Sequence, residues 1–331
     1  MTPTIEVIGA TRRYGAKIAV DGVDMTLTPG RITCLLGPSG CGKSTLLRLI
    51  AGLEPLDAGR ILAQGRDISG EPPERRGIGL VFQDYALFPH ISVGENVGFG
   101  LQGLTRAERE GRVRTLLEPV HLADRTGSFP GELSGGEQQR VALVRALARA
   151  PHTVLMDEPF SGLDSHLKGE VRLATLKALR ATDAAVLIVT HDAEEAMQMA
   201  DDMALMNEGK ILQRGTPEDC YRNPVSVAAA RLLGEAETLD AQIDAGQAHT
   251  AFGDLPAAGL RDGPAQVMVR PDGFVVGAGV PAQVREVRFV GQAWRATLIS
   301  GEAAVSARLA APPAGNLSVS IDPARARIFV P

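Results

Sequence analysis

The fold is decided by one short segment, Gly37-Pro38-Ser39-Gly40-Cys41-Gly42-Lys43-Ser44. It has the pattern G-x-x-x-x-G-K-[ST], and it lies between an apolar run at 32–36 and a helical pattern at 43–51. Glycines let a backbone wrap closely around phosphate, and the N–H groups at the start of a helix attract the anion. The same letters could be a glycine-rich turn that happens to precede a lysine, but the strand before and the helix after favour a phosphate loop.

Within this phosphate loop, the lysine and the serine carry the chemistry. Lys43 is expected to reach the β- and γ-phosphates of a bound nucleotide, and the hydroxyl of Ser44 is expected to ligate Mg²⁺. Cys41 could be a redox sensor, but only backbone atoms meet phosphate at its position, which favours a small filler residue. The expected nucleotide contacts are Gly37, Pro38, Ser39, Gly40, Cys41, Gly42, Lys43, Ser44 and Thr45.

A second apolar run, at 153–157, ends in two adjacent acids. Side chains alternate along a strand, so Asp157 and Glu158 should point to different sides. Asp157 is placed to hold Mg²⁺ through water, and Glu158 to orient or deprotonate the water that attacks the γ-phosphate. Alone, these acids and Pro159 could equally be the turn that ends a strand; the phosphate loop upstream favours the catalytic interpretation.

His191 follows another apolar run, at 185–190. A lone histidine at a strand end is more often structural or solvated than catalytic. This one comes one helix and one strand after the acid pair, where its ring could contact the γ-phosphate.

A second candidate anion site lies in Leu133-Ser134-Gly135-Gly136-Glu137-Gln138-Gln139-Arg140. Ser134 is a natural helix N-cap, and the two glycines expose N–H groups at the start of the helix. One chain cannot easily fold both anion sites onto one phosphate, but two chains placed head to tail can. The sequence therefore predicts a homodimer in which each chain covers the other's phosphate loop.

Strands and helices alternate through the first two-thirds of the chain. Apolar runs predict buried strands at 32–36, 78–82, 153–157 and 185–190. Helical patterns occur at 43–51, 135–150, 166–181 and 193–200. This order predicts an α/β fold whose mostly parallel sheet is covered on both faces. Residues 5–27 predict a separate antiparallel layer, and 104–121 predict part of a helical insertion.

The amino-acid composition of the chain changes near residue 233. The remainder is rich in Ala, Gly, Pro and Val, and 311–315 is expected to be a loop. Short β-like runs occur at 266–269, 284–290, 295–299 and 326–330. Turn residues separate these runs, which predicts a small all-β barrel or sandwich.

Bulk composition excludes several classes of protein. The chain has 331 residues and a formal net charge of −5. It lacks the overall positive charge that is typical of proteins that bind nucleic acid. Its three cysteines fit no zinc or disulfide pattern, which suits a reducing cytoplasm. No secretory signal is visible, and no apolar run approaches the roughly 20 residues of a membrane span. Work at a membrane would therefore require docking on a protein that spans it.

In their order and setting, these motifs resemble those of the ABC transporter ATPases over residues 1 to about 234. The resemblance implies a P-loop NTPase fold, an ABC-type nucleotide-binding domain with an antiparallel β-subdomain and a helical subdomain. It implies that Tyr14 stacks on adenine, that Gln83 touches Mg²⁺ and senses the permease, and that Asp164 reaches across the dimer. The implied signature is Ser134, Gly135, Gly136 and Glu137. The implied catalytic residues are Lys43, Gln83, Glu158 and His191, and the implied metal ligands are Ser44, Gln83 and Asp157.

The tail resembles the transport-associated OB-type regulatory (TOBE) domain of importer ATPases. The likeness lies in Met268-Val269-Arg270-Pro271-Asp272 and in the later segment 287–291. The expected domains are therefore an ATPase at 1–235 and an OB-like domain at 236–331. Arg270 is as good a candidate for a structural salt bridge as for a ligand contact.

The resemblance further implies an importer subunit at the cytoplasmic face of the inner membrane. Its partners would be a second copy, integral-membrane permease subunits and, through them, an external solute-binding protein. Segments 81–90, 220–224 and 233–236 resemble ferric-iron importer ATPases, although polyamine, sulfate and sugar importers share much of them. A soluble ABC ATPase without a permease is the main alternative, but it usually carries tandem domains or coiled-coil insertions. An exporter ATPase is a third class, less expected with this type of tail.

Overall fold

The computed structural model describes residues 4–101 and 103–330. By internal contacts the chain divides into two compact units, Met1–Pro217 and Glu218–Pro331. Each unit has a hydrophobic core of its own. The domain limit expected at residue 235 stays a prediction.

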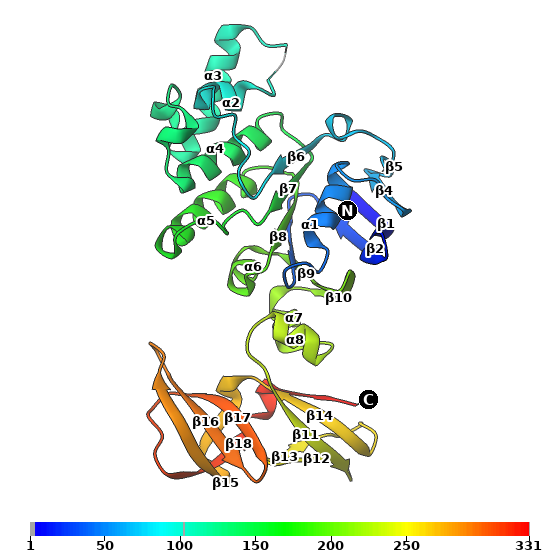
Figure 1. Cartoon of the computed structure of the whole chain (residues 1–331), viewed down its shortest axis with the longest axis vertical. Coiled ribbons are helices and arrows are strands. Elements are labelled where there is room, and N and C mark those ends of the chain that lie inside the picture. Colours follow the sequence, from blue (N-terminus) through cyan, green and yellow to red (C-terminus); the bar gives the residue numbers. More distant parts are fainter. Residues whose placement is uncertain (1–3, 102, 331) are drawn as a thin grey trace. The chain divides into compact units, whose positions relative to one another are not determined.

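The first unit is built on a six-stranded sheet in the order β10-β9-β3-β8-β7-β6. Figure 1 labels β6, β7, β8, β9 and β10 of this sheet. Its strands are β3 (Ile32–Leu36), β6 (Ile78–Val81), β7 (Thr153–Asp157), β8 (Ala185–Thr190), β9 (Asp202–Asn207) and β10 (Lys210–Gly215). Only β10 pairs antiparallel, with β9. Every residue of β3, β7 and β8 is buried, as expected of strands covered on both faces. The predicted α/β fold with a mostly parallel sheet is confirmed.

A four-stranded antiparallel sheet, ordered β2-β1-β4-β5, covers part of this framework. Its strands are β1 (Ile5–Tyr14), β2 (Lys17–Leu27), β4 (Ala58–Ala63) and β5 (Arg66–Asp67). Residues of this sheet, of α1 (Lys43–Ala51) and of the parallel strands form one continuous core. The predicted antiparallel layer at 5–27 is confirmed.

A helical region with a core of its own completes the unit. The helices after α1 are α2 (Val93–Gly98), α3 (Arg106–Leu117), α4 (Gly135–Leu147), α5 (Ser165–Arg180) and α6 (Ala193–Met199). Capping boxes at Ser92, Thr105 and Ser134 begin three of them, because each is followed three residues later by a glutamate that bonds back. The helix predicted at 43–51 matches α1, whereas the other three predicted helices end slightly late, at 150 rather than Leu147 for α4. Over the residues that the structure covers, no helix is both long and apolar enough to cross a bilayer.

The second unit contains two short helices and two antiparallel sheets around one core. The helices are α7 (Pro217–Arg222) and α8 (Val227–Leu232). One sheet, β13-β12-β11-β14-β19, comprises β11 (Glu237–Asp244), β12 (Gln247–Thr250), β13 (Gly253–Pro256), β14 (Gly263–Val269) and β19 (Ala326–Phe329). The other, β17-β16-β15-β18, comprises β15 (Phe274–Phe289), β16 (Trp294–Ser300), β17 (Ala303–Leu309) and β18 (Asn316–Ile321). The all-β tail predicted from its turns is confirmed, and it fits an OB-like domain.

Arg270 ties the helical start of this unit to its sheet. Its Nη1 donates to the carbonyls of Ala230, Gly234 and Glu235 at 3.0, 3.4 and 3.2 Å. Its guanidinium lies 4.3 Å from the centre of the Tyr221 ring. The side chain is buried, and within 4–101 and 103–330 it forms no ion pair. Of the two roles expected of Arg270, the salt bridge is not found among the described residues, because the side chain bonds carbonyls and lies against an aromatic ring instead. The ligand contact stays a prediction.

We expect Arg270→Met to destabilise the second unit by about 2–4 kcal/mol, because buried carbonyls would lose their donor. Urea unfolding of the full chain, followed by circular dichroism, measures this change. Arg261→Met is the matched control, since Arg261 is an exposed arginine of the same unit. Equal stability of the two variants would contradict the role given to Arg270.

Candidate nucleotide site

The structure brings several predicted site residues to one edge of the parallel sheet. The phosphate loop follows the end of β3, Asp157 and Glu158 close β7, and His191 follows β8. Because β3, β7 and β8 run parallel, their carboxyl ends meet at the same edge. In open α/β sheets, ligands bind at this edge.

The phosphate loop requires glycine at two of its positions. A Cβ on Gly37 would lie 2.2 Å from the carbonyl oxygen of Met206. A Cβ on Gly42 would lie 2.0 Å from the carbonyl oxygen of Ala19, and Gly42 has a φ of 109°. The buried Lys43 donates from Nζ to the carbonyls of Gly37 and Pro38 at 2.8 and 3.0 Å. The loop thus folds around its own ammonium group, which is positioned to meet an anion.

Asp157 and Ser44 form an oxygen pair beside the loop. The Ser44 hydroxyl donates to Oδ1 of Asp157 at 2.9 Å. Burial raises the pKa of Asp157, while the Ser44 hydrogen bond acts in the opposite direction. A hydroxyl and a carboxylate are hard oxygen donors, so this pair fits the preference of Mg²⁺.

Glu158 and His191 form a second polar pair, directly after the ends of β7 and β8. Oε2 of Glu158 lies 3.0 Å from Nδ1 of His191, and half of the His191 side chain is exposed. Glu158 has a left-handed backbone with φ 44°, held by its N–H bond to the Val189 carbonyl at 2.9 Å. Strain of this kind at a non-glycine residue gathers at functional sites. The two adjacent acids therefore have different partners, although Glu158 lies beyond the end of β7, where strand alternation does not set its direction.

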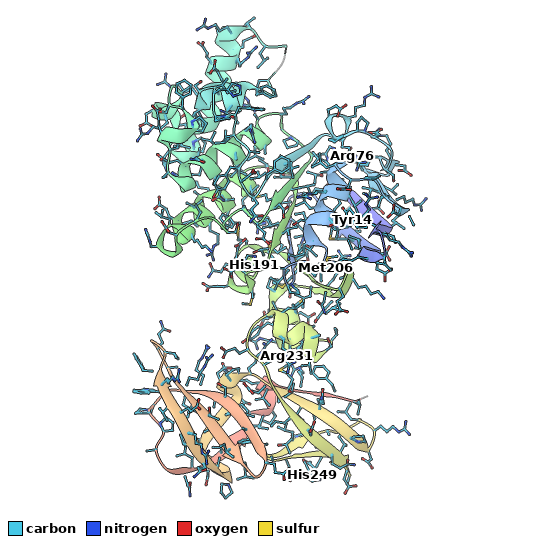
Figure 2. The ribbon with its side chains drawn as sticks, viewed as in Figure 1. Tyr14, Arg76, His191, Met206, Arg231 and His249 are labelled. Atoms are coloured by element: carbon cyan, nitrogen blue, oxygen red, sulfur yellow. The ribbon has the colours of Figure 1, made fainter. Side chains whose placement is uncertain are left out.

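Two hollows flank the acid pair. One, of about 290 Å³, is lined by Tyr14, Lys17, the phosphate loop, Thr45 and Glu158. Tyr14, labelled in Figure 2, is 44% exposed, and the Arg12 guanidinium lies 4.9 Å from its ring centre. The other hollow, of about 620 Å³, brings Gln83 next to Asp157.

Sequence reasoning missed two cations at these hollows. Lys17 pairs with Tyr14 across the β1–β2 hairpin and lines the smaller hollow. Arg48, on α1, lines the larger hollow, and its charge favours the ionised form of Asp157. The position of Lys17 opposite Tyr14 was a usable signal, because a two-residue turn joins the strands at that point. Nothing in the sequence marked Arg48 as a site residue, because a single arginine on a helix is ordinarily an exposed residue without a specific role.

The signature residues do not join this cluster within one chain. Ser134, Gly135, Gly136 and Glu137 line neither of the two hollows. Ser134 caps α4, accepting from the Glu137 N–H at 3.4 Å, while Glu137 accepts from the Ser134 N–H at 2.8 Å. Ser134 and Gly135 are exposed, as is Asp164, whose side chain makes no capping bond at the start of α5. Gly136 is buried, so the capped start of α4 faces solvent through Ser134 and Gly135.

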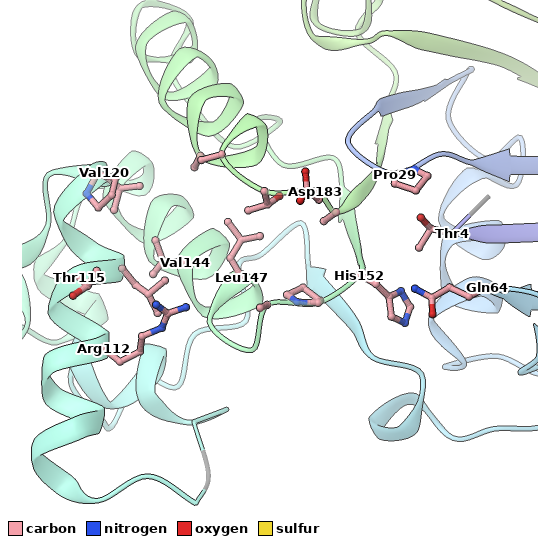
Figure 3. Close-up of a pocket in the computed structure, with 18 residues that line it drawn as sticks. Thr4, Pro29, Gln64, Arg112, Thr115, Val120, Val144, Leu147, His152 and Asp183 are labelled. Carbon is pink, nitrogen blue, oxygen red and sulfur yellow. The ribbon is translucent and has the colours of Figure 1, made fainter. Parts of the chain in front are cut away.

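A further hollow, of about 660 Å³, lies at the opposite ends of the strands (Figure 3). Its lining includes Arg112, Leu147, His152 and Asp183, and none of the predicted site residues. His152 directly precedes β7, and Asp183 lies just before β8. The amino ends of parallel strands are not where such sheets bind ligands, so this hollow is not the nucleotide site.

Glu195 is a buried acid next to the site edge. It lies in the first turn of α6, and its Oε1 has no hydrogen-bond partner among the described residues. Burial, reinforced by the charge of Asp192, raises the pKa of Glu195 to about 7. Arg172 and the Thr190 hydroxyl act in the opposite direction. This carboxyl group therefore binds a proton near neutral pH.

We expect Glu195→Gln to stabilise the fold at pH 8 and to have a much smaller effect at pH 5. The pKa is higher in the folded state, so the wild type loses stability as pH rises from about 4.5 to about 7. That difference in pKa corresponds to about 3 kcal/mol. Urea unfolding at both pH values measures it, with the exposed neighbour Glu194→Gln as control. An equal gain at pH 5 and pH 8 would contradict the assignment.

Comparison with known proteins agrees with this geometry. Residues 20–161 match the family model described as ABC transporter. The chain is 45% identical to the Fe(3+) ions import ATP-binding protein FbpC 3 of Rhodococcus jostii, covering 88% of this chain and 86% of that protein. It is 42% identical to the sulfate/thiosulfate import ATP-binding protein CysA 2 of Chromobacterium violaceum, covering 89% and 83%.

A solved structure shares the architecture. It is cbiO1 from Clostridium perfringens, part of the ABC transporter complex cbiONQ, with a TM-score of 0.63 and 28% identity. The match covers 67% of this chain and 92% of that one. With the family model, the relatives and the geometry in agreement, the chain belongs to the ATP-binding proteins of the ABC transporter family.

Proposed function

We propose that this chain is the ATP-hydrolysing subunit of an ABC importer and works as a homodimer that closes on ATP. The observation that carries the proposal is the arrangement of the first unit. The phosphate loop, Asp157, Glu158 and His191 share one sheet edge, whereas the capped start of α4 lines neither hollow there. A second copy supplies the missing signature.

The residues at this sheet edge have different roles in binding and hydrolysing ATP. Lys43 exchanges its bonds to the loop carbonyls for bonds to the β- and γ-phosphates. Ser44, Asp157 and Gln83 would hold Mg²⁺, whose charge offsets that of the phosphates. Glu158 accepts a hydrogen bond from the attacking water, and His191 fixes the direction of the Glu158 carboxylate.

The remaining contacts are made by Tyr14 and by the partner chain. Tyr14 offers an exposed ring for stacking on adenine. Ser134, Gly135 and Gly136 of the second copy present N–H groups and a hydroxyl to the γ-phosphate. Asp164, exposed at the start of α5, reaches across the same seam. Closure then depends on the γ-phosphate, and hydrolysis reopens the pair.

The permease is proposed to dock on the helical region. Phe99, which follows α2, is 60% exposed. It borders a hollow of about 690 Å³ between α2 and α3. An exposed aromatic ring beside a hollow is a common anchor for a partner protein. Such docking would place the chain at the cytoplasmic face of the inner membrane, with a solute-binding protein outside.

Ferric iron is the proposed cargo. The R. jostii relative is named as an iron importer subunit, and its match covers most of both chains. The sulfate/thiosulfate relative lies only slightly further away, so sulfate is the first alternative, followed by polyamine and sugar. Cargo is selected in the permease and binding protein, so the sequence of the ATPase depends only weakly on which cargo is transported.

Uptake of labelled Fe³⁺, sulfate and spermidine in a deletion strain tests the proposal. Wild-type protein should restore Fe³⁺ uptake, and Glu158→Gln should not. Restored uptake of another solute would replace iron as cargo while keeping the importer role. If no uptake depends on the gene and the protein never fractionates with membranes, a soluble ABC ATPase is the correct class.

A further inference from the structure

The loop that carries Gln83 contains two consecutive residues with left-handed backbone. Tyr85 has φ 61° and Ala86 has φ 44°, and neither is glycine. The N–H of Tyr85 donates to the Phe82 carbonyl at 3.0 Å, which closes a tight turn around Gln83. Left-handed backbone is unfavourable for residues with a Cβ, so it persists only where the surroundings hold it.

Arg145 is the residue that holds this turn. Its Nη1 donates to the Ala86 carbonyl at 2.7 Å, and its Nη2 donates to the Tyr85 carbonyl at 2.9 Å. The same guanidinium lies 5.6 Å from the centre of the Phe88 ring. A planar fork of two donors fixes two carbonyls at once, which a lysine cannot do.

Arg145 belongs to the last turn of α4, the helix that begins after Ser134. A helix of 13 residues moves as one body, so a displacement of its capped start would reach Arg145. In the other direction, the Phe88 ring packs against Phe99, with 4.7 Å between their centres. Arg145 thus connects the start of α4, the turn after Gln83 and the exposed Phe99.

We propose that Arg145 is a positioning residue that places Gln83 in the nucleotide site according to the position of α4. This inference rests on the proposed function, in which Gln83 acts next to Asp157 in the hollow that they share. While Arg145 holds both carbonyls, the turn keeps Gln83 in that hollow. Without Arg145, Tyr85 and Ala86 relax toward ordinary backbone, and Gln83 leaves its place.

The first test is the Mg²⁺ dependence of ATP hydrolysis by the full-length protein. Arg145→Gln should raise the Mg²⁺ concentration for half-maximal activity about tenfold, which is the effect of about 1.4 kcal/mol of lost positioning. ATP affinity measured without Mg²⁺ should stay within about twofold. Should Arg145→Gln fail to fold, Arg145→Lys keeps the charge, loses the fork and should shift the Mg²⁺ dependence in the same direction.

Arg149→Gln is the matched control. Arg149 lies four residues after Arg145, just beyond the end of α4, is exposed and, in the described part of the chain, bonds no residue of 82–88. A loss of stability with unchanged Mg²⁺ dependence in Arg145→Gln would show a merely structural role and overturn the inference.

A rescue variant separates positioning from general damage. In the Arg145→Gln protein, Ala86→Gly should lower the Mg²⁺ concentration for half-maximal activity most of the way back to the wild-type value. Glycine adopts left-handed backbone without strain, so the turn should keep its shape without Arg145. Failure of this rescue would overturn the inference, since relaxation of the turn would then not be the cause of the defect.

A double-variant comparison shows which residue Arg145 acts through. In a Gln83→Ala background, Arg145→Gln should cause no further change. If it causes the same fold-change in both backgrounds, Arg145 does not act through Gln83 and only this inference fails. If Gln83→Ala alone leaves the Mg²⁺ dependence unchanged, the role given to Gln83 under the proposed function fails, and the inference fails with it.

Discussion

Glu158→Gln should lower the turnover number for ATP at least about a hundredfold while leaving ATP binding within about twofold. The amide keeps the size of the side chain but cannot accept a proton from water. Its partner His191 lies 3.0 Å away, and in the described part of the chain neither residue hydrogen-bonds the phosphate loop, so the loop should keep its shape. Phosphate release measures turnover, and titration with a fluorescent ATP analogue measures affinity.

Glu194→Gln provides the control for this prediction. Glu194 is an exposed acid near the same edge, and its carboxylate accepts a hydrogen bond from Gln198 at 3.0 Å. Its removal should change turnover less than about twofold, as for ordinary surface positions. Near-normal hydrolysis by Glu158→Gln would remove Glu158 from the reaction and point to another base.

Gly42→Ala should weaken ATP binding about a hundredfold or more. The added Cβ would meet the Ala19 carbonyl oxygen at 2.0 Å, and a φ of 109° is unfavourable for alanine. Clash and strain together amount to about 3 kcal/mol, which is two orders of magnitude in affinity. Relief requires the loop to move, and with it the N–H groups and Lys43 that are proposed to meet phosphate. Calorimetric titration with ATP measures the loss.

Gly40→Ala makes the comparison sharp because Gly40 belongs to the same loop. It also has a left-handed φ, of 78°, but an added Cβ there meets no atom within 4 Å. Alanine at 40 therefore suffers strain without a clash, and we expect a loss of about tenfold. Equal losses at 40 and 42 would show that the space beside Ala19 is irrelevant.

The parts of the fold that surround the motifs were predictable from sequence. β3, β7 and β8 occupy the predicted residues because they are short apolar runs that end at motif residues. The β9–β10 hairpin was missed: Glu208 and Gly209 form its two-residue turn with positive φ at both residues, but Glu-Gly is not one of the dipeptides that mark such turns. In the tail, β15 has 16 residues and its pairing shifts between Val276 and Val280, so no single apolar run marks it.

The parts that sequence could not supply are arginines that bond distant carbonyls and contacts between copies. Arg145 and Arg270 bond carbonyls of distant segments, whereas arginine is by default an exposed residue. The signature shows the second limit. Its residues form an ordinary capping box in one chain, so their proposed contact with nucleotide depends on a partner.

The shared nucleotide seam is tested most directly by oxidative cross-linking of Ser39→Cys/Ser134→Cys in the Glu158→Gln background. The native Cys34, Cys41 and Cys220 are buried and should stay silent. With ATP and Mg²⁺, the account predicts a covalent product of twice the 34.9 kDa chain mass, absent without nucleotide and absent in each single-cysteine variant. A product that remains at the mass of one chain under saturating ATP and Mg²⁺ would contradict the head-to-tail dimer.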